Sequence, residues 1–400
     1  MNDSIIPNID EILKKDRSGE LLTSSDLLFL LSRSFSFPIS HLETLKGQEE
    51  NNKRYIVQDL YNALRATDEA EDGRFPITDK IDALRKLHYC YAEVARRDSK
   101  DSIDDLITGD LRIATEKMMS GAISEHKRVF IKHFARGTVL KSTQGFSQPI
   151  RDIIRNSVGN MSVGMIKALE ARELQKVTDL VEYCDYVAGL VGIGLTQIVE
   201  ATDNQHEILD KNKAKVLGRG LQLTNVAKNI REDQDARADY PDSRTLFIPR
   251  ELFPGMNPQE LFYSKDKVAK DMRENVFESL YGLARENLKD SAGYVASIPD
   301  YLSGYKAFCF SPLVTAIETW KLMYHSGAQR IFEGDESAVK ISRDTFKNIL
   351  EFTVTAVQSG KINEFLTEYI ENPKKYSFQS GDKRANYEQW NSKWNSANAA

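Results

Sequence analysis

The sequence has 400 residues, of which 41% are hydrophobic and 28% charged, and its net charge at pH 7 is −5. Such a composition is ordinary for a globular protein, and the length is ample for one sizeable core. The mild acidic balance, without a strongly basic block, argues against a nucleic-acid-binding protein.

The ends of the chain carry no targeting signal that we recognise. The first 20 residues include several charges and no long apolar core, so we expect no signal peptide. The longest apolar run, residues 187–195, is too short to span a bilayer, and the tail from 373 to 400 is polar. Cys90, Cys184 and Cys309 are widely spaced, which favours a reduced protein. We therefore expect a soluble, cytoplasmic protein without a transmembrane anchor.

Helical periodicity dominates the chain. Glycine and proline are sparse (22 and 11), and apolar residues recur every three or four positions, which predicts an almost entirely helical protein. We expect a capped helix start at Ser24, a break within residues 38–53, since Pro38 disfavours helix before it, and a loop over residues 236–249. Asn257 should cap a further helix, with Glu260 completing the cap. The main predicted helices cover residues 55–71, 79–95, 103–120, 123–134, 149–174, 213–233, 266–291, 305–326 and 342–359.

One acidic cluster lies at the end of the predicted helix 55–71. Asp68, Glu71 and Asp72 have the spacing i, i+3 and i+4, so they share one helix face, and Tyr61 and Arg65 precede Asp68 by two turns and one turn. Carboxylate oxygens are the ligands that Mg²⁺ prefers. Taken alone, such a cluster is more often a solvated helix face than a metal site.

A second polar cluster repeats this spacing on the predicted helix 213–233. Asn229, Glu232 and Asp233 share one face, with Gln222 and Asn225 upstream on the same side. Between the two clusters, residues 183–195 are apolar and rich in glycine, which indicates close packing or a cavity because each helical glycine costs about 1 kcal/mol relative to alanine. Together, the clusters suggest a polyanion held by divalent cations over an apolar pocket.

These segments resemble squalene synthases, within the squalene/phytoene synthase family. The likeness includes the run Tyr183 to Leu195, Gln222 and Asn225 before the second cluster, the run Ser32 to Phe35, the first cluster with Tyr61 and Arg65, and Phe308-Cys309-x-x-Pro312. It continues through Ile331-Phe332-x-Gly334 and Val339-Lys340-Ile341, so it covers roughly residues 24–359 in order. The resemblance implies one all-α domain of isoprenoid synthase fold over residues 24–372, with helices around a central cavity, an extension before it (1–23) and a polar tail after it (373–400).

The resemblance also implies an activity. Two farnesyl diphosphates would bind with Mg²⁺, join to presqualene diphosphate and be reduced by NADPH to squalene. The implied catalytic residues are Tyr183, Asp68, Asp72 and Asp233, and the implied metal ligands are Asp68, Glu71, Asp72, Asn229, Glu232 and Asp233. Substrate contacts would come from Ser32, Arg33, Phe35, Tyr61, Arg65, Val187, Val191, Leu195, Gln222, Asn225, Lys228 and Phe308, and cofactor binding from Lys340. We expect a monomer with peripheral membrane contact for product release.

Some positions depart from the family pattern and keep alternatives open. Asn229 stands where the family has Asp, Gly73 replaces a further carboxylate, and Ser342 replaces an expected Arg near Lys340. A family lysine falls near His126-Lys127. One alternative is therefore an enzyme that ionises farnesyl diphosphate but uses another acceptor or ending, without NADPH. A non-catalytic scaffold is disfavoured, because the carboxylates of both clusters persist.

Overall fold

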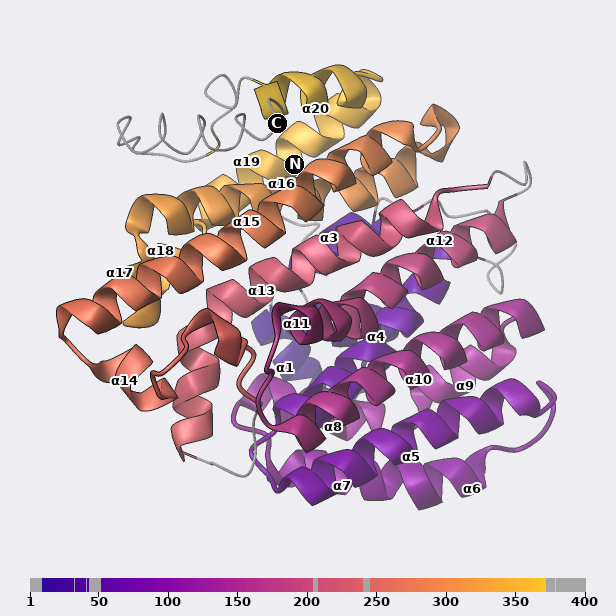
Figure 1. Ribbon diagram of the computed structural model, residues 1–400. Coiled ribbons are helices and arrows are strands. Elements are labelled where there is room, and N and C mark those ends of the chain that lie inside the picture. Colours follow the sequence, from indigo (N-terminus) through magenta and orange to yellow (C-terminus); the bar gives the residue numbers. More distant parts are fainter. Residues whose placement is uncertain are drawn as a thin grey trace. The chain divides into compact units, whose positions relative to one another are not determined.

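The computed structural model describes residues 9–31, 33–40, 42, 52–203, 208–239, 245–371 and 378. Within these ranges the protein is all-α, as predicted, and the β-structure is limited to one isolated bridge between Glu173 and Leu246. The chain forms two compact units that interleave in sequence (Figure 1). Unit 1 contains residues 1–172, 190–209 and 239–245, and unit 2 contains residues 173–189, 210–238 and 246–400. The prediction of a single domain over residues 24–372 stays a prediction.

Unit 1 is built around α4, α5, α10 and α12, which pack on one another. On α4, Val57, Leu60 and Leu64 face the core, as the periodicity predicts. Two glycines let the helices approach closely, because a Cβ on Gly159 would lie 2.8 Å from His88 Nε2 and one on Gly194 2.6 Å from Ser157 Oγ. The helices are α1 (Ile9–Arg17), α2 (Ser24–Leu31), α3 (Arg33–Ser40), α4 (Lys53–Asp72), α5 (Ile77–Arg96), α6 (Asp104–Leu106), the π-turn η3 (Ile107–Leu111), α7 (Arg112–Ser120), α8 (Glu125–Phe134), α9 (Thr138–Gly145), α10 (Gln148–Ala171) and α12 (Leu190–Thr202).

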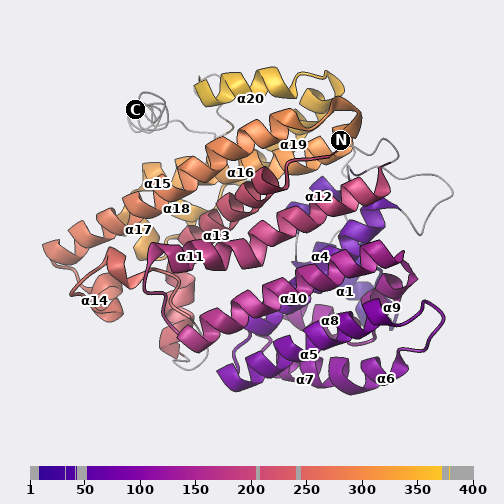
Figure 2. The ribbon, with the colours of Figure 1, turned by 45° about the vertical axis from the view of Figure 1, so that its right-hand side comes forward.

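In unit 2, α16 packs between α15 and α19, and α20 covers α15 and α19 (Figure 2). The Trp320 indole donates to Thr224 Oγ1 at 2.9 Å, which ties α16 to α13. Asn257 and Glu260 form the predicted capping box at the start of α14. The helices are α11 (Val177–Cys184), the π-turn η4 (Asp185–Gly189), α13 (Lys211–Asp239), η5 (Arg250–Leu252), α14 (Pro258–Tyr263), α15 (Lys267–Ser297), η6 (Asp300–Leu302), α16 (Ser303–Ser326), α17 (Ala328–Phe332), α18 (Glu336–Val339), α19 (Arg343–Gln358) and α20 (Ile362–Glu371).

The helix break predicted within residues 38–53 is confirmed, because α3 ends at Ser40 and α4 begins at Lys53. The helix before Pro38, which the proline should disfavour, nevertheless forms, since α3 contains Pro38. In so short a helix the proline removes one backbone donor near the end and is tolerated. The predicted boundary at Ala236 is wrong, because α13 continues to Asp239 before the loop begins.

The apolar run at residues 187–195 belongs to a longer helix than the run itself suggests. Helix is continuous from Val177 to Thr202, over 26 residues. Among the described residues, this is the one helix with the length and composition to cross a membrane, although core helices of globular proteins meet the same criterion. The absence of a transmembrane anchor stays a prediction.

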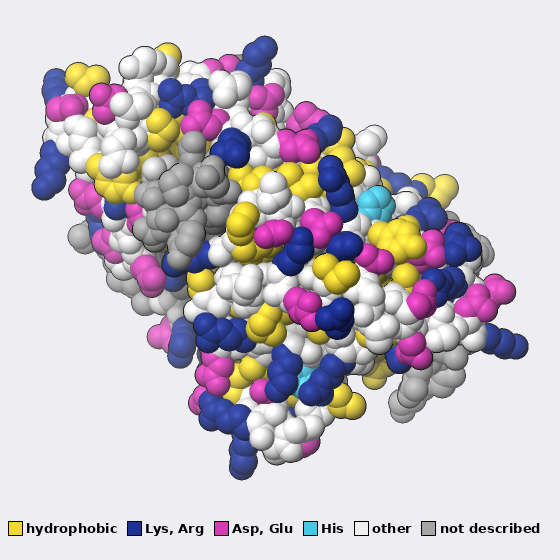
Figure 3. Space-filling view, turned by 90° about the horizontal axis from the view of Figure 1, so that it is seen from below, with side chains coloured by type: hydrophobic (Ala, Val, Ile, Leu, Met, Phe, Trp, Pro, Cys, Tyr) yellow, Lys and Arg dark blue, Asp and Glu magenta, His cyan; other side chains and the backbone are white. Residues whose placement is uncertain are grey.

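Charged side chains of both signs are interspersed on the face drawn in Figure 3. Lys and Arg alternate there with Asp and Glu rather than forming one block of a single sign. This pattern agrees with the near balance of 54 basic and 59 acidic residues in the whole chain. The expectation that the protein does not bind nucleic acid stays a prediction.

Asp59 on α4 makes the stability of unit 1 depend on pH. Its carboxylate is 2% exposed and accepts a 2.5 Å hydrogen bond from Ser24. Burial raises the pKa of Asp59 to about 6, although the hydroxyls of Ser142 and Ser24 act in the opposite direction. Because the folded pKa lies above the unfolded one, this group destabilises the fold increasingly as pH rises from about 4 to 6.

Relative to the parent, the free energy of unfolding of Asp59→Asn should therefore increase by about 1–1.5 kcal/mol when pH rises from about 5 to 7.5. Urea unfolding at the two pH values measures the difference. Asp26→Asn is the control, because the pKa of Asp26 is lowered, through hydrogen bonds from Thr23 and Lys15 that outweigh its burial. The effect of Asp26→Asn should not change over that range, and the same constancy for Asp59→Asn would contradict the assignment.

Candidate active site

The first acidic cluster lies on the last two turns of α4, in unit 1. Asp68 and Asp72 are half-buried, so both carboxylates reach solvent. The Arg65 guanidinium donates to Asp68 and to Glu69, and Lys127 Nζ lies 2.8 Å from Glu69 Oε2. Glu69, only 2% exposed, therefore holds two cations beside the predicted ligands. Arg65 and the region of Lys127 were predicted from the sequence as parts of the site, but Glu69 was not. Its position four residues after Arg65 could have indicated the ion pair between them.

The charges on this face act strongly on one another. The pKa of Asp68 is raised to about 6, chiefly by burial and also by the nearby Asp72 and Glu69, while Arg65 acts in the opposite direction. Although burial lowers the pKa of Arg65, the carboxylates of Asp68, Glu69 and Asp72 raise it above its ordinary value. Arg65 is thus held as a cation, and the face combines fixed positive charge with crowded carboxylates.

Glu71 differs from its two neighbours. Glu71 is 6% exposed. The ammonium group of the buried Lys80 donates a hydrogen bond to the backbone carbonyl oxygen of Glu71. The predicted ligand trio therefore divides into two half-buried carboxylates, Asp68 and Asp72, and one buried carboxylate. Lys80 could not be predicted as a neighbour of Glu71 from the sequence, because only the packing of α5 against α4 brings the two residues together.

Gly73 ends α4 under an aromatic ring. A Cβ at this position would lie 2.2 Å from Phe75 Cε1 and 3.2 Å from the Glu69 carbonyl oxygen. A carboxylate side chain at residue 73, as the family pattern has it, would require Phe75 to move. The departure at Gly73 therefore has a local packing reason in this chain.

The other predicted contacts of unit 1 lie on α3 and α12. The ring of Phe35 packs against that of Tyr61 at a tilt of 35°, with 4.8 Å between centroids. Val191 and Leu195 are half-buried on α12. Ser32 and the side chain of Arg33 lie outside the described residues. Phe35 and Tyr61 thus provide an aromatic surface beside the acidic end of α4.

In unit 2, Tyr183 is buried at the end of α11 and Val187 is buried in η4. The ring of Tyr183 packs on Phe247, with 4.6 Å between centroids. Phe308 is buried in α16 and stacks on Tyr305 at 6.0 Å. The predicted pocket residues of this unit are therefore mostly enclosed, and Phe247 is a neighbour that the sequence analysis did not identify.

The second cluster lies on α13. Glu232 and Asn225 are exposed, and Gln222, Lys228, Asn229 and Asp233 are half-buried. The Asn229 amide donates to Asn225 Oδ1 at 3.4 Å. Burial lowers the pKa of Lys228, as does Lys340, while Glu232 and Asp233 raise it. Lys340 therefore acts electrostatically on the predicted phosphate ligand Lys228, and it also pairs with Glu336 at 3.0 Å.

Arg231 anchors this part of α13. Its Nε lies 2.8 Å from Asp235 Oδ1, its NH1 donates to the Phe332 carbonyl at 3.0 Å, and its guanidinium lies over the Tyr263 ring. Gly334 has a φ of +79°, and a Cβ there would lie 2.8 Å from Arg231 Cγ. The segment Phe332-x-Gly334, noted in the sequence for its likeness to the family, thus packs on the helix that carries Asn229.

In the part of the chain that the structure describes, no group of three or more His, Cys, Asp or Glu side chains is arranged to hold a metal ion. The assignments of metal ligands, catalytic residues and substrate contacts stay predictions.

Comparisons with known proteins agree with this architecture. Residues 50–345 match the squalene/phytoene synthase family. Squalene synthase 1 of Arabidopsis thaliana is 28% identical over 334 residues, covering 82% of this chain and 70% of the relative. Inactive squalene synthase 2 of the same plant is also 28% identical, over 333 residues, with the same coverage. A ligand-bound structure of TcSQS has the same fold, with a TM-score of 0.64, 23% identity and coverage of 94% and 96% of the two chains.

The family match covers most of the chain, so this protein belongs to the squalene/phytoene synthase family. It is accordingly a prenyltransferase of all-α isoprenoid synthase fold, in a family that binds prenyl diphosphates.

Proposed function

We propose that this prenyltransferase joins two molecules of farnesyl diphosphate to presqualene diphosphate, with Mg²⁺. The observation that carries the proposal is the pairing of carboxylates with a basic group on each of two helices: Asp68 and Asp72 beside Arg65 on α4, and Glu232 and Asp233 beside Lys228 on α13. Overall likeness is a weaker argument, because squalene synthase 1 and inactive squalene synthase 2 of Arabidopsis thaliana match this chain equally well.

The residues present fit Mg²⁺. The ion is a hard cation that usually takes one or two protein carboxylates and fills its other positions with water and substrate phosphate. Asp68 and Asp72 reach solvent on α4, and Glu232 and Asp233 do so on α13, with the Asn229 amide as a further oxygen ligand. Bound there, Mg²⁺ would neutralise diphosphate charge and favour its departure.

The protein's own side chains supply the remaining chemistry. Arg65 and Lys228 bind phosphate oxygens, since a guanidinium and an ammonium both donate charge-assisted hydrogen bonds. As diphosphate leaves one farnesyl group with the bonding electron pair, a double bond of the other substrate captures the resulting allylic cation. Closure of the cyclopropane ring of presqualene diphosphate then releases a proton, which the departing diphosphate accepts. An aromatic face such as that of Tyr183 stabilises positive charge, and buried apolar side chains such as Val187 exclude water.

The residues do not fit NADPH equally well. Lys340 is exposed and paired with Glu336, and the Ser342 hydroxyl bonds to Thr345 at 2.9 Å. A single exposed lysine is not a dinucleotide site, so we derive no hydride step. Asn229, which stands where the family has Asp and donates to Asn225 Oδ1 at 3.4 Å, favours the second candidate function, an enzyme with another acceptor or ending.

The test is incubation of the purified protein with farnesyl diphosphate and Mg²⁺, with and without NADPH, and identification of the products by mass spectrometry. We expect presqualene diphosphate under both conditions, and squalene only if NADPH is used. Farnesyl diphosphate consumed to neither product would support the second candidate and contradict the first.

Asn229→Asp tests the second site. If the amide weakens metal binding there, the added carboxylate should lower the Mg²⁺ concentration for half-maximal rate by about 3- to 10-fold, because Mg²⁺ sites depend on ligand charge. The measurement is initial rate against Mg²⁺ concentration. Asn212→Asp, exposed at the start of the same helix, is the comparison, since it adds the same charge at a position outside every predicted contact. Equal effects of the two substitutions would argue for a general charge effect.

We further propose a cytoplasmic monomer that touches membranes peripherally when it releases product. In support, Cys90, Cys184 and Cys309 are free thiols and all are buried.

A further inference from the structure

The helix from Val177 to Thr202 contains a π-turn, η4 (Asp185–Gly189), directly after Tyr183. In a π-turn the backbone hydrogen bonds skip one residue more than in an α-helix, and such turns are often found at functional sites. Each extra residue rotates the following chain by about 100°, the angle that one residue subtends in a helix. The π-turn is a less favourable geometry than the α-helix around it, so it calls for local interactions that hold it.

Those interactions come from α13. Arg219 binds the Asp185 carboxylate with two nitrogens, Nε to Oδ1 at 2.7 Å and NH2 to Oδ2 at 3.0 Å. Lys215, one turn earlier on α13, places Nζ 2.9 Å from Asp185 Oδ2. The Asp185 side chain is only 16% exposed. A two-pronged guanidinium–carboxylate pair fixes orientation as well as distance, so these charges define the rotation of the turn's first residue.

The backbones of the turn and of α13 also touch between these charges. A Cβ on Gly218 would lie 2.2 Å from the Ala188 carbonyl oxygen, and one on Gly189 would lie 3.0 Å from Lys215 Cγ. No side chain fits between the two segments at this point. The ion pairs and the glycine contact therefore hold η4 against α13 as one junction.

We propose that Asp185, Arg219 and Lys215 form a clamp that positions Tyr183 relative to the diphosphate-binding face of α13. Tyr183 is two residues before the clamped aspartate, and Arg219 lies ten residues, about 15 Å of helix, before Asn229 on α13. The clamp residues act through the backbone and need not touch substrate. The assignment rests on the proposed function, because it gives Tyr183 a role at the reacting centre.

Asp185→Asn is the main test, because it keeps the size of the side chain and removes its charge. We expect kcat for farnesyl diphosphate consumption to fall about 10- to 100-fold, because misplacing a reacting group by about 1 Å can slow a reaction by that factor. KM should stay within about 2-fold of the parent value. Amide hydrogen exchange over residues 183–189 should become about 10-fold faster, because the turn opens more readily.

The matched control is Asp110→Asn. Asp110 lies in the other π-turn, η3, and pairs with Lys86 of α5 at 2.8 Å, with a side chain 33% exposed. This substitution should speed exchange at residues 107–111 and leave kcat unchanged, which separates a loosened π-turn in general from loss of the clamp.

Two outcomes overturn the proposal. One is amide hydrogen exchange over residues 183–189 that does not change in Asp185→Asn; the other is faster exchange with kcat still within about 2-fold of the parent.

If Asp185→Asn does not fold, Arg219→Lys tests the same point, since it keeps the positive charge and loses the second hydrogen bond to the carboxylate. It should lower kcat about 3- to 10-fold, and full activity would count against the clamp. A parent protein that does not consume farnesyl diphosphate would remove the proposed function, whereas the exchange measurement would still test the clamp.

Discussion

Asp68→Ala should lower the turnover of farnesyl diphosphate by at least about 1,000-fold, because the electrostatic stabilisation of a departing charged group is usually the largest single contribution to such a rate. Asp68 is a half-buried carboxylate at the end of α4, and Arg65 already holds its position. Removing it takes away a charge that no neighbour can supply, since Glu71 is buried and residue 73 is a glycine under Phe75. Initial rates at saturating substrate and Mg²⁺ measure the effect.

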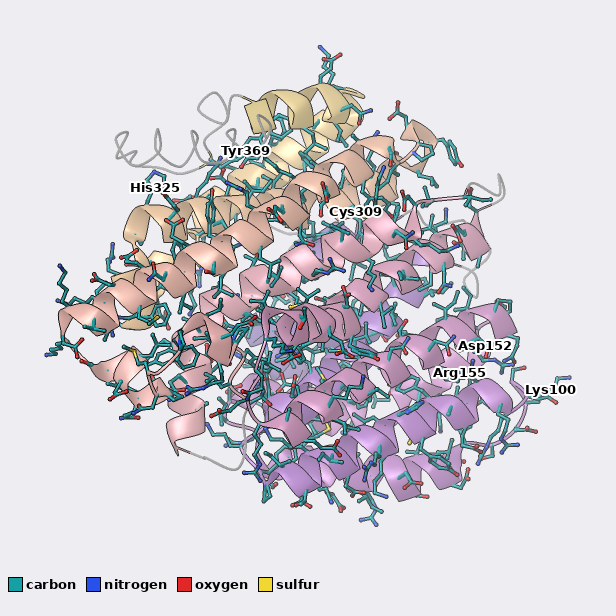
Figure 4. All side chains as sticks on the ribbon, in the orientation of Figure 1. Lys100, Asp152, Arg155, Cys309, His325 and Tyr369 are labelled. Carbon is teal, nitrogen blue, oxygen red and sulfur yellow. The ribbon has the colours of Figure 1, made fainter. Side chains whose placement is uncertain are left out.

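The matched control for Asp68→Ala is Asp152→Ala on α10. Asp152 and Arg155 form an i, i+3 ion pair at 2.9 Å, with both side chains a little over one-third exposed, and the two lie near each other on α10 (Figure 4). Loss of such a surface pair costs about 0–1 kcal/mol of stability. Its activity should equal that of the parent. Comparable activity in both variants would remove Asp68 from the metal site.

Lys321→Met should lower the free energy of unfolding of the protein by about 3–5 kcal/mol, because it leaves a charged carboxylate buried without its cation. Glu318 and Lys321 form an ion pair inside α16, with side chains 0% and 1% exposed. Lys321 Nζ also lies 2.9 Å from the Tyr369 hydroxyl of α20, and that hydroxyl donates to Glu318. Burial lowers the pKa of Lys321, while Glu318 raises it. Urea unfolding measures the loss.

The control for this prediction replaces the whole polar group at once. In the triple variant Glu318→Leu, Lys321→Met and Tyr369→Phe, no buried charge or hydroxyl of the cluster is left behind. Its free energy of unfolding should lie within about 1 kcal/mol of the parent or above it, because a buried ion pair seldom stabilises more than apolar side chains of similar volume. If the triple variant loses as much stability as Lys321→Met, lost packing rather than an unpaired charge is the cause.

Periodicity and spacing predicted the parts of the molecule that depend on neighbours in sequence. The buried face of α4 with Val57, Leu60 and Leu64 follows from the helical repeat, and the Asn257–Glu260 box from local capping chemistry. The shared face of Asp68 and Asp72 follows from their spacing alone. The all-α class follows from the same pattern repeated along the chain.

What escaped prediction depends on partners distant in sequence or on local geometry without a repeat. Lys127 meets Glu69, and Arg219 meets Asp185, only because separate helices pack together. A π-turn has no sequence period, so η4 could not be seen in the run after Tyr183. The burial of Glu71, which divides the predicted ligand set, likewise follows from the packing of α5 on α4.

The most direct test of the account is release of inorganic diphosphate from farnesyl diphosphate by the intact protein, followed as Mg²⁺ is added. This measurement reports ionisation of the substrate whatever the acceptor, ending or final product. We predict diphosphate release that rises with Mg²⁺ to saturation and is abolished by a chelator. No release above the protein-free rate at any Mg²⁺ concentration would contradict the central claim that this prenyltransferase ionises a prenyl diphosphate with Mg²⁺.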